Sequence, residues 1–295
     1  MVGCGDVGRR LGAALAQRGA DRLRVVGVVR DPAQAARLRE AGIVPLVADL
    51  DRRASLGRLR ALAHWMIDLA PPPNAGPDDP RTARLLAALR AGPRAPGGRR
   101  RASGVAPRRW VYISTTGVYG DCAGALFDET RPTAPGSDRA GRRLDAERRF
   151  RAAARAGAAR PALLRVPGIY AQDRLPLERL RQRLPALSAG DDVHTNHVHA
   201  DDLARIAWAA VFRGRPARVV HAVDDTDLKM GDYFDRVADA FGLPRPPRLA
   251  RAELAARVSP VMLSFMSESR RLRNERLKRE LRVRLRYPDV DHLLS

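Results

Sequence analysis

The chain has 295 residues, a formal net charge of +21 and two cysteines, Cys4 and Cys122. No apolar run reaches the length of a membrane helix and no signal peptide is visible, so we expect no membrane contact and a cytoplasmic location. Two cysteines are too few for a disulfide framework or a zinc ribbon, and the length suits one α/β domain with a smaller appended lobe.

The positive charge raises the question of nucleic-acid binding, because arginines are dense at 99–101 and 270–286. Arginine supplies 52 of the 54 cationic residues, whereas phosphate binding selected for charge alone would accept lysine as well. The first block lies in a Gly/Pro-rich stretch, 92–107, interpreted as a mobile surface loop, and the second mixes glutamates with arginines as on a salt-bridged helix face. We therefore expect a solvated basic surface and no nucleic-acid partner.

A glycine-rich turn, Gly-x-Gly-x-x-Gly, opens the chain and precedes a helical pattern and a β-branched run. Glycines are needed there because the turn is tight, the backbone approaches a pyrophosphate and the helix lies close to its strand. The N–H groups at the helix start then face the anion. The sequence therefore predicts a dinucleotide-binding turn formed by Gly3, Gly5, Asp6, Val7 and Gly8.

Only Met1 and Val2 precede this turn, although a Rossmann fold places its central strand there. A two-residue central strand would leave backbone groups of its neighbours unpaired. We therefore hypothesise that Met1 is an internal start and that a few apolar residues lie upstream in the native protein.

The first half of the chain alternates β-branched runs with helical patterns, which predicts a Rossmann-type doubly wound parallel sheet. Strands are expected at 23–29, 44–48, 65–69, 110–114, 162–166 and 219–222, and helices at 32–41, 56–62, 81–90, 138–156, 200–211 and 231–241. We assign 1–170 to an NAD(P)-binding domain, to which 200–225 returns, and most of 171–295 to a smaller mixed substrate-binding lobe.

Three strand ends carry candidate cofactor residues. Arg30 stands where an NAD-selective site usually presents a carboxylate, and it suits a 2′-phosphate, although Asp31 is adjacent. We favour NADP and keep NAD as the alternative. Asp49 and Leu50 follow the next strand and could frame the adenine, and Leu69, Ala70 and Pro71 follow the strand after that, where proline stiffens a backbone close to the cofactor.

Three further motifs follow in order, at 112–120 (YISTTGVYG), 164–170 (LRVPGIY) and 196–202 (NHVHADD). With the glycine turn, they resemble the extended short-chain dehydrogenase/reductase family, the epimerase/dehydratase-like group of NAD(P)-binding proteins. The resemblance implies that Thr115 hydrogen-bonds the reacting oxygen of a substrate and that Pro167 lies beside the cofactor.

The family also expects Tyr-x-x-x-Lys at the start of a long helix, often with a glutamate four residues after the lysine. Counting back from Glu147 places the lysine position on Arg143 and the tyrosine position on Arg139, so the pair is absent. Arginine stays protonated and cannot replace the tyrosine as a proton carrier. Arg143 could hold ribose hydroxyls or an oxyanion, and Arg139 could bind an acidic substrate or lie exposed on the helix.

Tyr119 is our first candidate for the missing acid/base, with structural packing at the strand end as the alternative. The histidines His194, His197 and His199 raise the question of a metal site, but in the family this segment leads into a helix that Asp201 or Asp202 can cap. We therefore predict no metal.

The C-terminal stretch 267–288 resembles that of atypical bacterial members of the family. Its apolar positions Leu272, Leu277 and Leu281 suit a one-sided helix against the second lobe. Taken together, we predict an NAD(P)-dependent oxidoreductase or epimerase with a small-molecule substrate, for which a nucleotide sugar is one option. The alternative is a non-catalytic NADP(H)-binding redox sensor, and a homodimer through the 138–156 helix is left open.

Overall fold

The computed structural model describes residues 1–17, 23–59, 62–90, 108–157 and 159–295. The arginines at 99–101 and the surrounding stretch 92–107 lie outside these residues, so the expectation of a surface loop there stays a prediction. Part of the helix expected at 56–62 lies outside them too.

Parallel strands form the centre of the first domain. Strands β3 (Trp65–Asp68), β4 (Arg109–Thr115), β6 (Arg160–Val166) and β11 (Val219–His221) pair in the order β11-β6-β4-β3. Strands β1 (Val26–Val29) and β2 (Val44–Val47) form a second parallel pair. Val2 joins the two groups by single bridges to Val28 and Asp68. The doubly wound α/β fold is confirmed.

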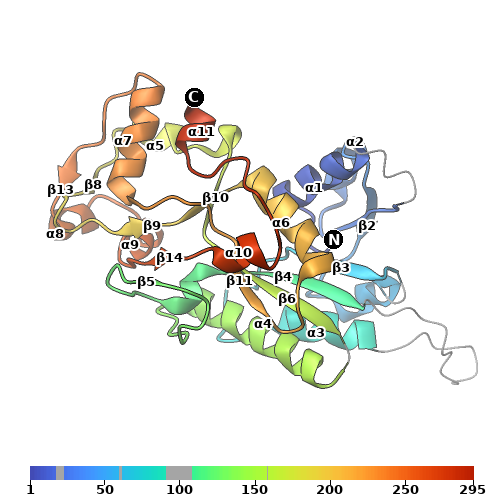
Figure 1. The fold of residues 1–295 in the computed structure, drawn as a ribbon. Helices are drawn as coiled ribbons and strands as arrows, with labels where there is room; N and C mark the ends of the chain where they lie inside the picture. Colours follow the sequence, from blue (N-terminus) through green and yellow to red (C-terminus); the bar gives the residue numbers. More distant parts are fainter. Residues whose placement is uncertain (18–22, 60–61, 91–107, 158) are drawn as a thin grey trace, which may run out of the picture.

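Helices cover both faces of this sheet (Figure 1). Helices α1 (Asp6–Ala16) and α6 (Ala200–Arg213) lie on one face, and α3 (Pro80–Arg90) and α4 (Asp138–Arg155) lie on the other. Alternation along β4 decides which side chain meets which layer, because successive residues of a strand point to opposite faces. Val111 and Ile113 join the α1/α6 core, whereas Trp110 and Tyr112 pack with Phe150 of α4.

Short elements build the second lobe and its junction with the sheet. Its core contains Tyr170, Leu180, Phe234, Leu254 and Met266. The parallel pairs are β7 (Gly168–Tyr170) with β10 (His197–His199), β8 (Ala186–Leu187) with β13 (Arg248–Leu249), and β5 (Leu126–Phe127) with β14 (Arg271–Leu272), and β9 (His194–Thr195) runs antiparallel to β12 (Leu228–Lys229). The remaining helices are α2 (Ala35–Glu40), α5 (Leu177–Arg181), α7 (Met230–Ala240), α8 (Arg251–Ala255), α9 (Pro260–Phe265), α10 (Glu275–Arg279) and α11 (Asp291–Leu294), with 3-10 turns η1 (Pro32–Gln34), η2 (Arg53–Leu59), η3 (Thr116–Tyr119) and η4 (Gln172–Arg174).

The C-terminal segment differs from the prediction of one long helix. Leu272 lies in β14, and the helix α10 spans only Glu275–Arg279. Leu277 and Leu281 pack into the α1/α6 core of the first domain and not against the second lobe. The physical reason lies at Asn274, whose side-chain amide donates to the carbonyls of Val223 and Asp224, each at 3.1 Å, and so fixes the chain beside the end of β11.

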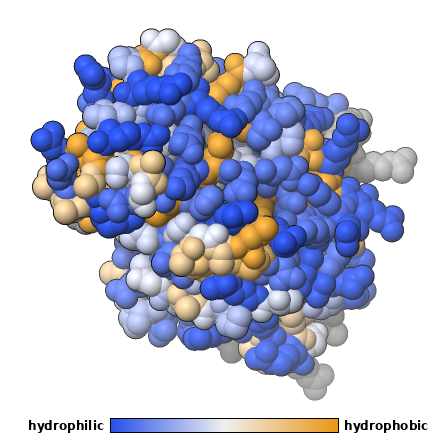
Figure 2. Space-filling model, turned by 60° about the vertical axis from the view of Figure 1, so that its left-hand side comes forward, coloured by the Kyte–Doolittle hydropathy of each residue, from blue (hydrophilic) through white to orange (hydrophobic). Residues whose placement is uncertain are grey.

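The face shown in Figure 2 is mostly hydrophilic, with hydrophobic residues in small separate groups. Many basic side chains of the described residues are paired. Arg218 and Arg276 both lie beside Glu280, for example, and Arg276 also contacts Glu129 at 3.2 Å. Among the helices of the described residues, none has both the length and the apolar character that crossing a bilayer requires.

Candidate functional site

The glycine turn at the start of α1 is pressed against the end of β3. Gly3 has a φ of +69°, and a Cβ added to it would lie 2.5 Å from the Cα of Ala70. Only glycine fits this position, because other residues are strained at positive φ and would clash with the backbone. Gly5 precedes α1 and provides no side chain to cap it. The N–H groups of the first helical turn therefore remain available to an anion.

A cavity of about 310 Å³ opens beside this turn, and we call it the turn cavity. Gly3, Gly5, Arg30, Asp49, Leu50, Ala70 and Pro71 line it, from the ends of three parallel strands. The sequence-derived candidates Asp6, Val7, Gly8, Leu69 and Pro167 are not among its lining residues. Asp6 instead pairs with Arg10 at 3.0 Å and Arg174 at 3.3 Å.

Arg30 and Asp31 lie side by side at the rim of the turn cavity, but their side chains have different environments. The carboxylate of Asp31 accepts a hydrogen bond from the N–H of Ala33 at 2.9 Å and so caps η1. Arg30 is exposed at the end of β1. One oxygen of Asp31 is therefore engaged in capping, and both side chains are exposed.

A larger cavity of about 740 Å³ lies between the first domain and the second lobe, and we call it the interlobe cavity. Pro71 lines both cavities, so they adjoin at the end of β3. Thr115, Arg139, Arg143 and Pro167 line the interlobe cavity. The structure thus brings the candidate residues of the strand ends and of α4 to one space next to the glycine turn.

Arg143 is fixed between the helix and the strand ends. One terminal nitrogen, Nη1, donates to the carbonyls of Ile113 at 2.8 Å and Ala70 at 3.2 Å, and to the hydroxyl of Tyr112 at 3.3 Å. The remaining N–H groups of a guanidinium are donors as well. Arg143 therefore presents a fixed positive charge at the edge of the cavity, one helical turn from Arg139.

Thr115 lies at the end of β4, directly before η3. Its Oγ1 accepts a hydrogen bond from the N–H of Gly117 at 3.2 Å. A threonine hydroxyl that accepts one bond still has its own proton to donate. The side chain can therefore donate to an oxygen atom in the interlobe cavity.

Tyr119 is placed differently from the expectation of a proton carrier. It is 1 % exposed and does not line the interlobe cavity. Its hydroxyl lies 2.6 Å from Nε2 of His221, whose Nδ1 lies 2.8 Å from the carbonyl of Arg273. Because Nδ1 must donate to that carbonyl, Nε2 accepts and Tyr119 donates. Burial raises the pKa of Tyr119 to about 12.

Two aromatic side chains of the cavity wall were not predicted from the sequence as site residues. His197 and Tyr233 are stacked, with ring centroids 4.2 Å apart, and both line the interlobe cavity. Burial lowers the pKa of His197 to about 4, and its Nδ1 has no hydrogen-bond partner within the described residues. The NHVHADD motif marked the segment of His197, but Tyr233 lies in a helix whose apolar pattern indicates only core packing.

The helix after this motif is capped by a different residue from the one expected. Nδ1 of His199 accepts a hydrogen bond from the N–H of Asp201 at 3.2 Å and caps α6. Asp202 instead accepts hydrogen bonds from the N–H groups of Arg286 and Tyr287, each at 2.8 Å. The predicted aspartate cap was wrong, because the distant C-terminal segment engages one aspartate and the histidine ring is closer to the helix start.

Glu147, the residue from which the missing pair was located, lies in a buried ionic network. Its two carboxylate oxygens accept from Arg165 at 3.0 and 2.8 Å, and Ser114 donates to it at 2.6 Å. Glu147 is fully buried and Arg165 is 3 % exposed. This network joins α4 to β4 and β6, and so sets the position of Arg143 one turn earlier in the helix.

Comparison with known proteins identifies solved structures with the same architecture. No protein-family model and no curated protein matched the sequence. Among solved structures, a functionally unknown conserved protein from Silicibacter pomeroyi DSS is 30% identical, covers 99% of this chain and 95% of its own, and has a TM-score of 0.80. A dTDP-glucose 4,6-dehydratase from Streptomyces venezuelae, solved with NAD bound, is 18% identical over 99% of this chain and 93% of its own, with a TM-score of 0.76. A short-chain dehydrogenase/reductase superfamily protein from Agrobacterium tumefaciens with bound NAD is 18% identical over 99% and 93%, with a TM-score of 0.72.

The likeness to the dehydratase and to the Agrobacterium protein extends over almost the whole of both chains. The chain therefore has the same fold as these two proteins. Helix α4 carries Arg139 and Arg143 at the two positions where the resemblance leads us to expect Tyr-x-x-x-Lys. The turn cavity corresponds in position to the glycine motif, and the interlobe cavity to the Ser/Thr motif.

Proposed function

We propose that the protein is an NAD(P)-dependent oxidoreductase or epimerase-like enzyme that acts on a small polar molecule. The observation that carries this proposal is the meeting of the two cavities at Pro71. A dinucleotide lying across that junction would have its pyrophosphate at the glycine turn and its reactive ring beside Thr115 and Arg143.

The residues of the turn cavity fit such a cofactor. The absence of a side chain at Gly5, where an added Cβ would meet nothing within 4 Å, leaves room for a ligand against the start of α1. Asp49 and Leu50 would contact the adenosine end, and the first N–H groups of α1 would bind the pyrophosphate. A nicotinamide dinucleotide supplies or accepts the hydride; the protein supplies binding, orientation and charge.

We further propose a preference for NADP over NAD. Arg30 is exposed at the end of β1, where a 2′-phosphate would lie, and its guanidinium can bind phosphate through two parallel hydrogen bonds. The carboxylate of Asp31 would favour NAD, but it is engaged in capping η1. Of the two neighbouring side chains, we therefore expect Arg30 to decide the preference, in favour of NADP.

Charge in the interlobe cavity supports an anionic substrate of the nucleotide-sugar type. Five arginines line it, at positions 139, 142, 143, 174 and 270, against one acidic side chain, Glu268. In the proposed reaction Thr115 donates to the reacting oxygen, and Arg143 stabilises negative charge that develops on it. His197 is neutral at pH 7 and would hydrogen-bond a substrate hydroxyl.

A non-catalytic NADP(H) sensor is the second candidate, and one observation favours it. Tyr119 lies beside His221 and does not line the interlobe cavity, which supports a structural role for it and leaves the site without a candidate proton carrier. A sensor would bind the oxidised and the reduced cofactor with different affinity and would not consume either. If the protein is an enzyme, the cofactor is oxidised or reduced in the presence of at least one substrate.

Calorimetric titration of NADP(H) and NAD(H) tests the cofactor site. We compare the parent chain with Gly5→Asp, which places a carboxylate at the pyrophosphate position without a clash, because a Cβ there meets nothing within 4 Å. Gly190→Asp is the matched control, since its Cβ also meets nothing within 4 Å and Gly190 lines neither cavity. We expect binding to be lost in the first variant and kept in the second. Absence of binding in the parent chain would refute the proposal.

Arg30→Ala tests the preference between the cofactors. We expect the Kd for NADPH to rise about tenfold or more, because a charge-assisted hydrogen bond to the 2′-phosphate is lost. The Kd for NADH should change little. An equal change for both would refute the role of Arg30. A screen of nucleotide sugars and small acids, with NADPH absorbance as the readout, then distinguishes an enzyme from a sensor.

A further inference from the structure

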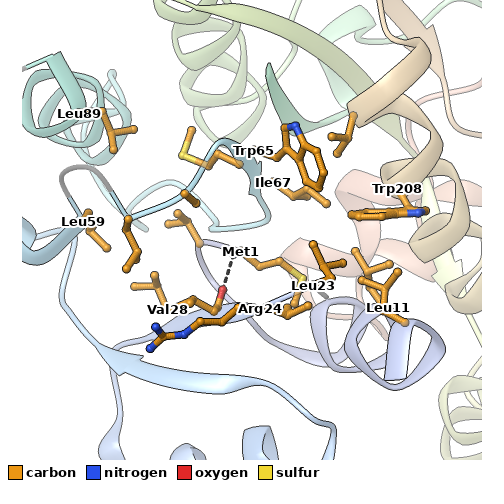
Figure 3. A pocket seen from close by; sticks show the side chains of 18 of the residues that line it. Met1, Leu11, Leu23, Arg24, Val28, Leu59, Trp65, Ile67, Leu89 and Trp208 are labelled. Atoms are coloured by element: carbon orange, nitrogen blue, oxygen red, sulfur yellow. Dashed lines mark hydrogen bonds between the residues drawn. The ribbon is translucent and has the colours of Figure 1, made fainter. Parts of the chain in front are cut away.

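The interlobe cavity differs in charge from the turn cavity and from the cavity shown in Figure 3. The cavity in Figure 3 has a volume of about 100 Å³, and its lining side chains are apolar apart from Arg24. The turn cavity has two arginines and two aspartates in its wall. The interlobe cavity has five arginines and one glutamate. Of these three cavities, the interlobe cavity is therefore the one suited to an anion.

Two of its five arginines are paired with carboxylates of the protein. Arg174 lies 3.3 Å from the carboxylate of Asp6, and Arg270 contacts that of Glu268. An anionic ligand at either arginine would compete with an existing ion pair. These two side chains therefore supply little of the positive charge that a ligand meets in the cavity.

The guanidinium groups of Arg142 and Arg143 contact only neutral groups within the described part of the chain. Arg142 donates to the carbonyls of Gly76 at 2.7 Å and Asn74 at 3.2 Å, and Arg143 donates to two carbonyls and to the hydroxyl of Tyr112. Arg142 is 6 % exposed, and its Nε has no hydrogen-bond partner there. Buried charges are normally paired, because removing a charge from water is costly. An anion in the cavity would supply the missing partner.

The absence of a side chain at Gly117 leaves a small space between Thr115 and α4, which we call the Gly117 space. A Cβ added to Gly117 would lie 3.5 Å from Oγ1 of Thr115 and 3.8 Å from Cβ of Ala140 in the first turn of α4. All three residues line the interlobe cavity. Arg143 is three residues after Ala140 and so lies on the same face of α4. A small group in the Gly117 space would therefore have Thr115 on one side and the arginine-bearing helix on the other.

The short separation of Thr115 and Arg143 distinguishes between the anions that arginine binds. Nη1 of Arg143 bonds to the carbonyl of Ile113, which is two residues, or about 7 Å of strand, before Thr115. Arginine binds carboxylates and phosphates alike through paired hydrogen bonds. In a phosphate ester, the ester oxygen and at least one carbon separate the phosphorus from a carbon that can be oxidised or reduced. A carboxylate can be attached directly to that carbon, so it fits the short separation better.

We propose that Arg143 and the Gly117 space bind the carboxylate of a hydroxy acid, or of the corresponding oxo acid, whose reacting oxygen lies at Thr115. The buried charge of Arg142 favours the same anion. This inference rests on the proposed function and narrows its anionic substrate to one whose carboxylate lies within one carbon of the carbon that reacts. Such a group can be part of a larger molecule, a nucleotide sugar included.

The first test compares racemic lactate with racemic lactamide, two probes of nearly equal size that differ in a carboxylate against an amide. Saturation-transfer NMR of the methyl group measures their binding, with and without saturating NADPH. We expect lactate to bind about tenfold or more tightly than lactamide, because the charge-assisted hydrogen bonds need the carboxylate. Equal affinity, or no binding of lactate, would overturn this inference. Failure of NADPH itself to bind would refute the proposed function, and the titration without cofactor then decides the carboxylate site separately.

Arg143→Met tests the charge. It should abolish the preference for lactate, whereas Arg148→Met, the matched control, should keep it, because Arg148 is exposed on the same helix and lines neither cavity. Arg143→Lys restores the charge and should regain part of the preference. A preference that persists in Arg143→Met would contradict the assignment.

Gly117→Ala tests the space without removing a charge. The added Cβ makes only ordinary van der Waals contacts, so Tm and NADPH binding should stay the same while lactate binding is lost. Gly141→Ala is the matched control, because its Cβ meets nothing within 4 Å and Gly141 lines neither cavity. Lactate binding in Gly117→Ala equal to that of the parent chain would overturn the proposal.

Inorganic phosphate tests the other source of an anion. It is added as a competitor of lactate, and we expect it to bind more weakly than lactate. Phosphate that binds more tightly than lactate, and loses that affinity in Arg143→Met, would overturn the carboxylate in favour of a phosphate group.

Discussion

The buried pair of Glu147 and Arg165 gives a stability prediction that can be worked from the geometry. In Glu147→Gln the carboxylate becomes a neutral amide, so the negative charge is lost and an NH₂ group faces one of the two guanidinium nitrogens that now bond at 3.0 and 2.8 Å. Arg165 is 3 % exposed, so water cannot replace the lost partner. Removing one partner of a buried ion pair costs about 3–5 kcal/mol, which corresponds to a fall in Tm of roughly 10 °C.

Urea unfolding followed by circular dichroism measures this loss. The matched control is Asp239→Asn, which breaks an exposed pair with Arg245 at 2.7 Å and should leave the midpoint unchanged. The double variant Glu147→Leu with Arg165→Met removes both charges and should regain most of the stability, because neither partner is then left unpaired. A loss below about 1 kcal/mol in Glu147→Gln, or a double variant no more stable than the single one, would refute the reasoning.

Tyr119→Phe leaves Nε2 of His221 buried without a hydrogen-bond donor, and it should lower the free energy of unfolding in urea by about 1–3 kcal/mol. The Kd for NADPH should stay the same. A large change in this Kd would contradict a structural role for Tyr119. Gly3→Ala places a Cβ 2.5 Å from the Cα of Ala70 at a φ of +69° and should weaken NADPH binding at least tenfold, whereas Gly190→Ala should not. Burial lowers the pKa of His221 to about 3, so below pH 6.5 the unfolded chain takes up a proton that the folded chain does not. Stability should therefore fall by about 1.4 kcal/mol per pH unit from this residue between pH 6.5 and 3, and an unchanged slope in His221→Gln would contradict that.

The regular elements of the first domain were predictable because their residues carry local signals. The predicted strand at 110–114 is observed as Arg109–Thr115, and the predicted helix at 138–156 as Asp138–Arg155. The continuous run of buried residues in β4 and a serine cap at Ser137 are both properties of short stretches of chain. The strand expected from residue 23 begins at Val26, where its pairing with Val44 of β2 starts.

The C-terminal segment shows where local patterns are insufficient. Leu272, Leu277 and Leu281 have a spacing that suits one helix, yet the first is in a strand paired with β5. The competing interactions come from Asn274 and from strand β5, which is far away in sequence. A pattern of apolar residues cannot show which distant segment will offer such partners.

The sequence by itself determined the order of the motifs and the glycine turn, and it predicted the loss of the Tyr-x-x-x-Lys pair, because each depends on which residues stand at fixed spacings. Only the tertiary structure decided what those residues face. It joined the turn cavity and the interlobe cavity at Pro71, turned the hydroxyl of Tyr119 to His221, and stacked His197 on Tyr233. The physical reason is that a site consists of side chains from separate strand ends and helices, and their distances are set by the packing of the sheet and the second lobe, which no short stretch of sequence encodes.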